Sequence, residues 1–107
     1  MLEVNDTEFQ KEVEKYRGLV VIDFWADWCA PCKSFLPIVK EVSELMGEKV
    51  KVLCMNIDTS PETPSRYGVR SIPTLMMFRH GSHIQTKVGA MSKSALETWI
   101  KSEIQLS

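Results

Sequence analysis

The chain has 107 residues, of which 44% are hydrophobic and 25% are charged, and its formal net charge is −1. This length suits one domain spanning 1–107, and the near-neutral charge gives no reason to expect nucleic acid or an anionic membrane as a partner. No apolar run approaches the ~20 residues that a membrane-spanning helix needs. The N-terminus lacks a secretory signal pattern, and three cysteines are an odd number for a paired extracellular framework. We therefore expect a cytoplasmic protein.

The N-terminal part of the chain predicts a strand, a helix and a second strand. Leu2–Val4 is the short first strand. Asn5 and Glu8 then stand in the positions of a capping box, which predicts a helix reaching about Tyr16. Leu19–Trp25 is apolar on both faces, as expected for the buried middle of a sheet that helices cover.

The middle of the chain predicts a long helix, a buried strand and a short helix. The long helix should begin near Cys29 and end near Met46. Pro37 lies inside it and should kink it, because proline lacks an N–H and clashes with the preceding turn. Val50–Ile57 is the next apolar strand, and after a turn a short helix is expected to reach about Tyr67.

The C-terminal part predicts a hairpin followed by a helix. Strand Pro73–Phe78 leads through a turn at His80 into strand His83–Val88. Ser92 then caps a last helix that buries Leu96 and the apolar residues one turn later. The whole order, β-α-β-α-β-α-β-β-α, predicts an α/β domain with a mixed sheet, in which βαβ crossovers precede an antiparallel hairpin.

Cys29 and Cys32 stand where the second strand gives way to the long helix. A helix N-terminus presents free backbone N–H groups and the positive end of the dipole, which favour a thiolate over a thiol. A spacing of three residues brings both sulfurs to one helix face, near enough to bond to each other or to capture the same target. The pattern predicts thiol–disulfide exchange. The alternative is half of a metal site, for which Cys54, His80 and His83 supply no evident second pair.

Asp23 is an acid in the middle of an otherwise apolar strand, between Ile22 and Phe24. A carboxylate that is buried there loses its hydration, so we expect the pKa of Asp23 to be raised. The alternative is that Asp23 lies near the end of the strand and pairs with an exposed cation. The residues by themselves leave both possibilities open.

Further motifs make the chain similar to the thioredoxin family over nearly its whole length. A CxxC pair alone would be a weak signal, but here several motifs occur in the family's order within a chain of the family's length. The matching segments are Val21–Ala26, Trp28–Lys33, Pro37, Asn56–Asp58, Tyr67–Arg70, Ile72–Thr74 and Val88–Ala90.

This resemblance implies the thioredoxin fold, an α/β arrangement with a central mixed sheet of about five strands and about four flanking helices. It implies that Cys29 is the nucleophile, that Cys32 is the resolving thiol, and that the two form a redox-active disulfide. It also implies that Asp23 transfers a proton to and from Cys32. The Ile72–Pro73 peptide is expected to be cis and to face the cysteines.

The resemblance further implies a mostly apolar surface around the cysteines, on which disulfide substrates dock. An adaptable apolar patch suits many partners better than a charged pocket would. Trp25, Pro37 and Cys54 are expected to support the site structurally, and no metal ligands are expected. The substrate-binding residues that we expect are Trp28, Ala30, Pro31, Ile72, Pro73, Val88, Gly89 and Ala90.

Two residues depart from the family's commonest pattern. Ala30 stands where glycine is most common, and we expect a small shift in potential or partner fit without a change of reaction. Cys54 stands where the familiar bacterial members usually carry a lysine near the buried acid, so Asp23 should have less help in ionising. A redox role for Cys54 is an alternative, but burial as a small apolar residue fits a strand position better.

The resemblance implies a general protein-disulfide reductase and electron carrier. We expect a monomer that acts on diverse disulfide-containing proteins and is recycled by a thioredoxin reductase of a type that the sequence leaves open. No nucleotide-binding glycine fingerprint is present, so no bound cofactor is expected. An oxidase or isomerase of the same fold is disfavoured by Ala30 and Pro31, because histidine is absent between the cysteines. A binding module with incidental cysteines is the alternative from a different class.

Overall fold

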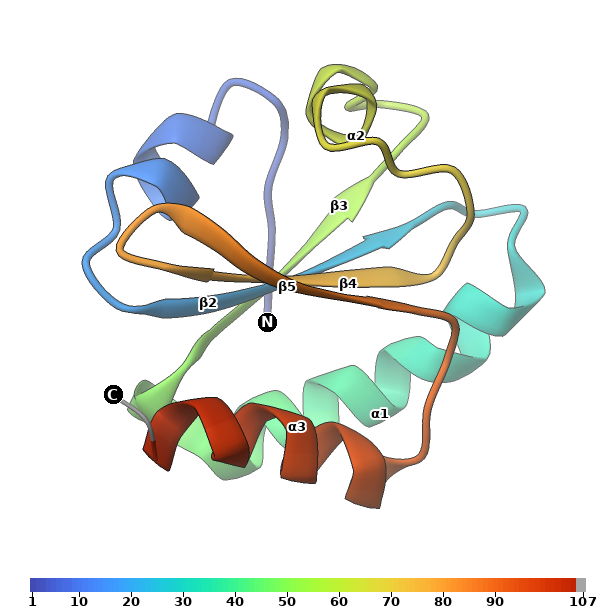
Figure 1. Ribbon diagram of the computed structural model, residues 1–107. Helices are drawn as coiled ribbons and strands as arrows, with labels where there is room; N and C mark the ends of the chain where they lie inside the picture. The colour runs from blue at the N-terminus through green and yellow to red at the C-terminus, as the bar shows by residue number, and fades with distance from the viewer. Residues whose placement is uncertain (106–107) are drawn as a thin grey trace.

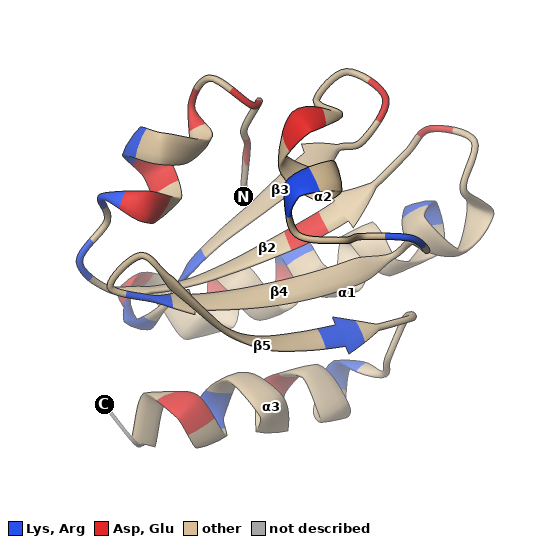
Figure 2. Ribbon diagram, turned by 45° about the horizontal axis from the view of Figure 1, so that its top comes forward, with Lys and Arg blue, Asp and Glu red and all other residues tan. Residues whose placement is uncertain are grey.

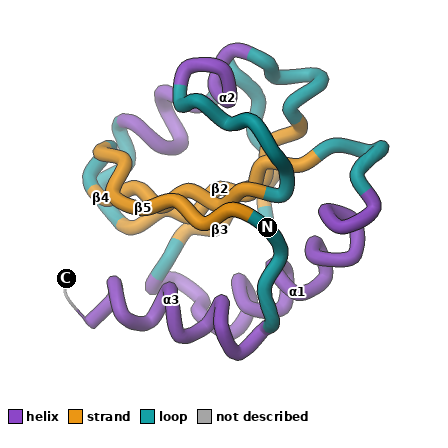
Figure 3. Tube along the Cα trace, turned by 45° about the vertical axis from the view of Figure 1, so that its right-hand side comes forward, coloured by secondary structure: helices purple, strands orange, loops and turns teal. Residues whose placement is uncertain are grey.

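The computed structural model describes residues 1–105, which form one five-stranded mixed sheet with helices on both faces (Figure 1). In Figure 1, α1 and α3 lie below the sheet, and α2 and the π-helical segment η1 lie above it. The same two layers of helix are visible from the side in Figure 3. The strands are β1 (Leu2–Glu3), β2 (Leu19–Trp25), β3 (Lys51–Asn56), β4 (Thr74–Arg79) and β5 (Ser82–Val88). The helical elements are η1 (Gln10–Glu14), α1 (Ala30–Met46), the 3₁₀ turn η2 (Gly47–Lys49), α2 (Glu62–Arg66) and α3 (Lys93–Gln105).

The order of the strands brings distant parts of the chain to one edge of the sheet. The order is β1-β3-β2-β4-β5, with β2 parallel to β3 and antiparallel to β4. Phe24 near the end of β2 is opposite Thr74, which begins β4, and Thr74 is opposite Val88, which ends β5. The segments after β2, before β4 and after β5 therefore meet. The predicted α/β class and the mixed sheet of five strands are confirmed.

Successive side chains of β2 enter two different hydrophobic cores, as the period of a strand requires. Val21 packs with Phe35 in the core beneath α1 and α3. Ile22 packs with Phe9 in the core on the opposite face of the sheet. Asp23 follows Ile22 and so shares the α1 side of the sheet with Val21. The middle strand is buried on both faces, as its composition predicts.

The first predicted helix is wrong in extent. Asn5 and Glu8 do form the capping box, because the Asn5 N–H donates to Glu8 Oε1 at 3.0 Å and the Glu8 N–H donates to Asn5 Oδ1 at 2.9 Å. The chain then makes turns and only a short π-helical segment, Gln10–Glu14. Tyr16 is exposed, and its ring centroid lies 4.3 Å from the ammonium group of Lys51. By Tyr16 the chain has already left the helix and is turning toward β2.

The other elements agree with the predictions to within a few residues at their ends. β2 has the predicted bounds, and α1 begins one residue after Cys29 and ends at Met46. Pro37 lies inside α1, and the kink that it should cause stays a prediction. Ser92 caps α3, since its Oγ accepts a hydrogen bond from the Ala95 N–H at 3.1 Å. No helix among residues 1–105 is both long and apolar enough to cross a bilayer.

A polar network fastens the hairpin to α3. The indole N–H of Trp99 donates to Gln85 Oε1 at 2.7 Å, and Gln85 Nε2 donates to Glu103 Oε1. Arg79 Nη2 donates to the Glu103 carbonyl at 2.6 Å and lies 3.2 Å from its carboxylate. Gln85 is the link between the buried Trp99 indole and the Glu103 carboxylate.

The Gln85→Leu variant is expected to lower the free energy of unfolding by about 2 kcal/mol, because it removes the acceptor of the buried Trp99 indole N–H and one hydrogen bond to Glu103. Urea unfolding followed by fluorescence measures this change. The control is Lys87→Leu, which lies on the same face of β5, is exposed and forms no ion pair among the described residues. If Lys87→Leu lowered the free energy of unfolding as much as Gln85→Leu does, the loss would come from leucine in β5. The polar network would then not explain the stability.

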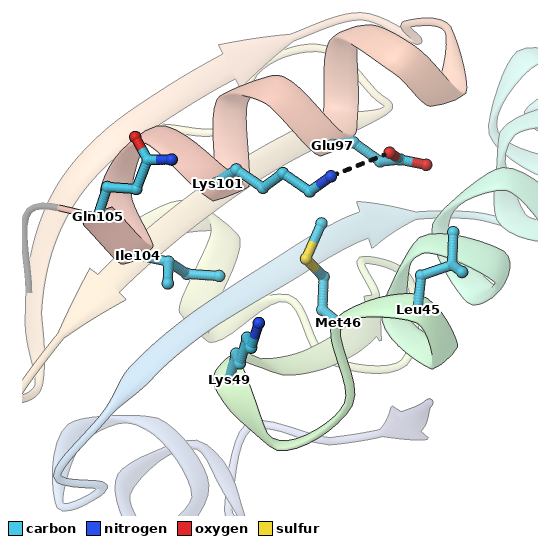
Figure 4. Close-up of a pocket in the computed structure, with 7 residues that line it drawn as sticks. All are labelled: Leu45, Met46, Lys49, Glu97, Lys101, Ile104 and Gln105. Atoms are coloured by element: carbon cyan, nitrogen blue, oxygen red, sulfur yellow. Dashed lines mark ion pairs between the residues drawn. The ribbon is translucent and has the colours of Figure 1, made fainter.

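The hollow drawn in Figure 4 lies between the C-terminal halves of α1 and α3. Met46 and Ile104 belong to the core at this place, and Lys101 Nζ reaches Glu97 Oε2 at 3.6 Å along α3. It lies at the opposite end of α1 from Cys29. We therefore assign it no part in the chemistry of the cysteines.

Candidate active site

Cys29 and Cys32 form a disulfide at the N-terminus of α1, with their Cα atoms 5.3 Å apart. Cys29 is the N-cap residue, and its Sγ accepts a hydrogen bond from the backbone N–H of Cys32 at 3.2 Å. Pro31 stands in the first turn, where its missing N–H costs the helix nothing. After reduction, the same N–H and the helix dipole favour a thiolate on Cys29.

The two sulfurs differ in their access to solvent. Cys29 is 5% exposed and Cys32 is 0% exposed, so both sulfurs are largely buried and Cys29 is the more accessible of the pair. Trp28, immediately before it, is 68% exposed. The two cysteines pack in a small apolar cluster with Ala26, Trp25, Ile57 and Ile72.

The loop before β4 lies against the disulfide. The Ile72–Pro73 peptide is cis, as expected, and Cys29 Sγ lies 3.8 Å from the Ile72 carbonyl oxygen. The Gly89 N–H donates to the Pro73 carbonyl at 2.8 Å, which joins the end of β5 to the same place. Pro73 is itself buried, whereas Val88 is 68% exposed. Of these residues, Val88 therefore presents the most surface to a partner.

Within residues 1–105, the carboxyl group of Asp23 is buried without a hydrogen-bond partner or a paired cation. It is 0% exposed and lies between Cys54 of β3 and Leu75 of β4 in the sheet register. In Figure 2, β2 is tan along most of its length, in keeping with its mainly apolar sequence. Neither carboxylate oxygen has a hydrogen-bond partner among the described residues. Burial raises the pKa of Asp23 to about 7. The predicted burial and raised pKa are confirmed, and the alternative of an ion-paired strand end is wrong.

Cys54 is the cross-strand neighbour of Asp23 and is 6% exposed. It is a free thiol, and its Sγ lies 3.9 Å from Glu3 Oε1. Burial, together with the nearby charges of Glu3 and Asp23, raises the pKa of Cys54 to about 12. The buried interpretation of Cys54 is confirmed, and little reactive thiolate is available to it at neutral pH.

Thiol titration of the reduced, native protein with a chromogenic aromatic disulfide is expected to report two rapid equivalents. Attack by Cys29 followed by Cys32 releases both, whereas Cys54 has a thiolate fraction on the order of 10⁻⁴ at pH 8, given its pKa of about 12. The third equivalent should appear only after unfolding in guanidinium. Cys54→Ala is the control, with two equivalents in both conditions, and a third rapid thiol in the native protein would contradict the buried assignment.

The segment after β3 anchors the Trp28 indole through hydrogen bonds. The sequence did not lead us to expect this role of the segment. The Trp28 indole N–H donates to Asp58 Oδ2 at 2.9 Å, and the Asp58 N–H donates to Asn56 Oδ1 at 2.9 Å. Asn56 Nδ2 also donates to Asp27 Oδ2 at 3.4 Å, and Ile57 packs beside the cysteines. Trp28 follows β2 and Asp58 follows β3. The carboxyl ends of two parallel neighbouring strands meet at one edge of a sheet, so these positions in the sequence were the available signal for the contact.

Trp25 and Pro37 lie beside the site, but only Trp25 packs against the cysteine cluster. Trp25 packs against the cysteine cluster, and its buried indole N–H has no partner among the described residues. Pro37 is exposed on α1, and both residues line a shallow apolar hollow that also reaches Cys54. Within residues 1–105, no group of three or more histidine, cysteine or acidic side chains could hold a metal ion.

Residues 1–102 match the family model described as thioredoxin. The chain belongs to the thioredoxin family. The thioredoxin of Rickettsia typhi is 50% identical over 101 residues, which cover 94% of this chain and 96% of that protein. The thioredoxin of Pseudomonas aeruginosa is 45% identical over 104 residues, or 97% of this chain and 96% of its own. The thioredoxin of Rhodospirillum rubrum is 44% identical over 104 residues, or 97% of this chain and all of its own.

Membership of the thioredoxin family assigns the chemistry of the disulfide. The Cys29–Cys32 pair lies in the Trp-Cys-x-x-Cys arrangement, at a helix N-terminus, beside a mixed sheet of five strands. The reaction of this site is thioredoxin-type exchange between a dithiol and a disulfide, and the protein is a thiol–disulfide oxidoreductase.

Proposed function

We propose that the protein is a general protein-disulfide reductase and electron carrier in which Cys29 is the nucleophile. The observation that carries the assignment is the N–H of Cys32 aimed at Cys29 Sγ, the more accessible of the two sulfurs. The Cys29 thiolate attacks a substrate disulfide, forms a mixed disulfide and releases one substrate thiolate. Cys32 then attacks Cys29 Sγ, releases the second substrate thiol and closes the disulfide. Two electrons thus pass from the dithiol to the substrate.

Asp23 is the proposed proton-transfer group for Cys32. Cys32 is 0% exposed, so its proton needs a buried acceptor before the thiolate can attack. A carboxyl whose pKa is about 7 can both take up and release a proton near neutral pH. Asp23 projects from the face of the sheet that α1 covers, and Cys32 stands in the first turn of that helix. These placements support the role of Asp23 as a positioned acid and base.

The proposed docking surface surrounds the Cys29 sulfur. Trp28 and Val88 are each 68% exposed and offer apolar area to a partner. The cis peptide at Pro73 places the Ile72 carbonyl beside Cys29, where backbone groups of the loop can meet an extended substrate. Ala30, Pro31, Gly89 and Ala90 complete the proposed surface, all at the edge of the sheet where the three segments meet.

The proposed cycle needs a partner to return the electrons. The disulfide itself stores them, so we propose no bound cofactor and a separate thioredoxin reductase. We propose that residues 1–107 act as one domain and as a monomer in the cytoplasm, with diverse disulfide proteins as substrates and neither nucleic acid nor membrane as a partner. The unpaired Cys54 supports a reducing compartment, where free thiols persist.

Reduction of insulin disulfides tests the proposal. With NADPH and a purified flavin-dependent thioredoxin reductase, or with a ferredoxin-linked reductase in a parallel arm, the protein is expected to accelerate precipitation of the insulin B chain. The arm that works identifies the type of electron donor. A binding module would not accelerate precipitation with either reductase. It would also fail to accelerate precipitation in a third assay, in which dithiothreitol supplies the electrons. An oxidase would instead oxidise a reduced, unfolded substrate faster than it reduces insulin.

A further inference from the structure

A hollow of about 580 Å³ lies between the end of β5, the loop that follows it and α3. Met91 and Trp99 contribute apolar surface to it, and Ala95 and Thr98 approach it from α3. None of these four residues belongs to the proposed docking surface around the disulfide. Its volume is within the ~300–1,000 Å³ range of pockets that take small ligands or a bulky side chain.

The hollow is continuous with the disulfide site. Val88 and Gly89 line it, and the Gly89 N–H is the group that donates to the Pro73 carbonyl at 2.8 Å. The residue before Pro73 places its carbonyl 3.8 Å from Cys29 Sγ. A substrate segment that crosses the cis-peptide loop and continues over Val88 therefore arrives at the hollow without leaving the surface.

The chemistry of the hollow favours an apolar group next to an acid. Trp99 forms the floor of the hollow and is 8% exposed. Its indole N–H already donates a hydrogen bond to Gln85, so Trp99 needs no polar partner from a ligand. Lys87 is exposed at the rim, is the single charged residue of the lining, and has no ion-pair partner among the described residues. An unpaired lysine beside an apolar floor is complementary to an acidic residue next to an apolar side chain.

We propose that this hollow binds an apolar side chain of the substrate protein, a few residues from the disulfide under attack, and that Lys87 pairs with an acidic neighbour of that side chain. The proposal rests on the proposed reductase function and specifies its preferred substrate class. Disulfide loops in which an apolar residue and an acid flank the cysteine would dock on Cys29 more tightly than loops without them.

Synthetic disulfide peptides test the preference directly. The panel holds a cystine within a Gly/Ser/Thr segment, and a Leu-Asp pair is moved through the first five positions on either side of the attacked cysteine. We expect the KM of reduction to fall at least fivefold at one or two adjacent positions, with kcat little changed, because the hollow adds binding energy away from the reacting sulfurs. Leu-Lys in place of Leu-Asp should lose most of this gain.

Two pairs of variants locate the effect. Thr98→Phe fills the hollow from the exposed face of α3, and its matched control is Ser94→Phe, an exposed position of the same helix that does not line the hollow. Lys87→Glu reverses the rim charge, and Lys11→Glu reverses an exposed charge on η1. Thr98→Phe should remove the leucine preference, and Lys87→Glu should exchange the preference for Asp with one for Lys. Both controls should behave as the parent.

Equal KM values across the panel, or a leucine preference that survives in Thr98→Phe, would overturn the inference while leaving the reductase function in place. If no peptide were reduced, including the plain one, the proposed function would fail and this inference with it. A second copy of the chain is the competing occupant of the hollow. A concentration-dependent dimer in sedimentation that Thr98→Phe disrupts would assign the hollow to self-association and overturn the proposal.

Discussion

Replacement of Cys29 by serine is expected to lower the turnover of insulin reduction by at least ~10³-fold, as the loss of an essential nucleophile does in other enzymes. A serine hydroxyl in the same position stays protonated at neutral pH and makes no stable bond to a substrate sulfur. The hydrogen bond from the Cys32 N–H then has no thiolate to stabilise. The measurement is steady-state reduction at saturating reductase, with folding verified by circular dichroism.

Two further variants make the result specific. Cys32→Ser keeps the first attack but not the second, so it should accumulate a mixed disulfide with the substrate that non-reducing electrophoresis detects. Cys54→Ala removes a thiol that lies outside the exchange and should retain full turnover. Undiminished reduction by Cys29→Ser would show that the nucleophile has been assigned to the wrong cysteine.

Replacement of Asp23 by asparagine is expected to stabilise the fold, increasingly so as the pH rises. The pKa of Asp23 is about 7 in the fold and ~3.9 in an unfolded chain, so between these values the folded state binds the additional proton. The free energy of unfolding therefore falls as pH rises through this window, by up to about 4 kcal/mol, and the loss is complete above pH ~7. Asparagine avoids that loss.

Urea unfolding of the oxidised protein at several pH values checks this prediction. The variant should match the parent near pH 4 and exceed it by about 2–4 kcal/mol at pH 8. Asp27→Asn, which alters an exposed acid just after the end of β2, should show no such trend. Asp23→Asn should also exchange disulfides more slowly near neutral pH, because Cys32 loses the proton acceptor proposed for it. A variant less stable than the parent at pH 8 would refute the argument from uncompensated burial.

Much of the fold was predictable because local patterns and burial agree. β2 is apolar on both faces and has the predicted bounds, and α1 begins where Cys29 can act as its cap. Asp23 was predictable for the opposite reason, since an acid conflicts with such a strand and conflicts of this kind are expected at functional sites. The end of the first helix, placed near Tyr16, was not predictable. The spacing of apolar residues does not show how soon the chain must turn toward its next strand.

The polar contacts of the site were less accessible to sequence interpretation. Nothing local to Trp28 indicates that Asp58 accepts its indole N–H, because that contact depends on the parallel pairing of β2 with β3. The fastening of α3 through Gln85 likewise depends on long-range packing. The unpartnered indole N–H of Trp25 is a third case, and it appears only once the cluster around it is assembled.

The strand order has a consequence for what survives partial unfolding. Cys29 and Cys32 are three residues apart, so the disulfide can open and close in a chain that has lost most of its architecture. The proposed docking surface is assembled from the segments at Pro73 and Val88, which meet Cys29 only when β4 and β5 are in register with β2. Electron exchange is thus a local property of the chain, while partner choice through the proposed docking surface needs the complete sheet. A damaged molecule would lose its discrimination before it lost its reactivity.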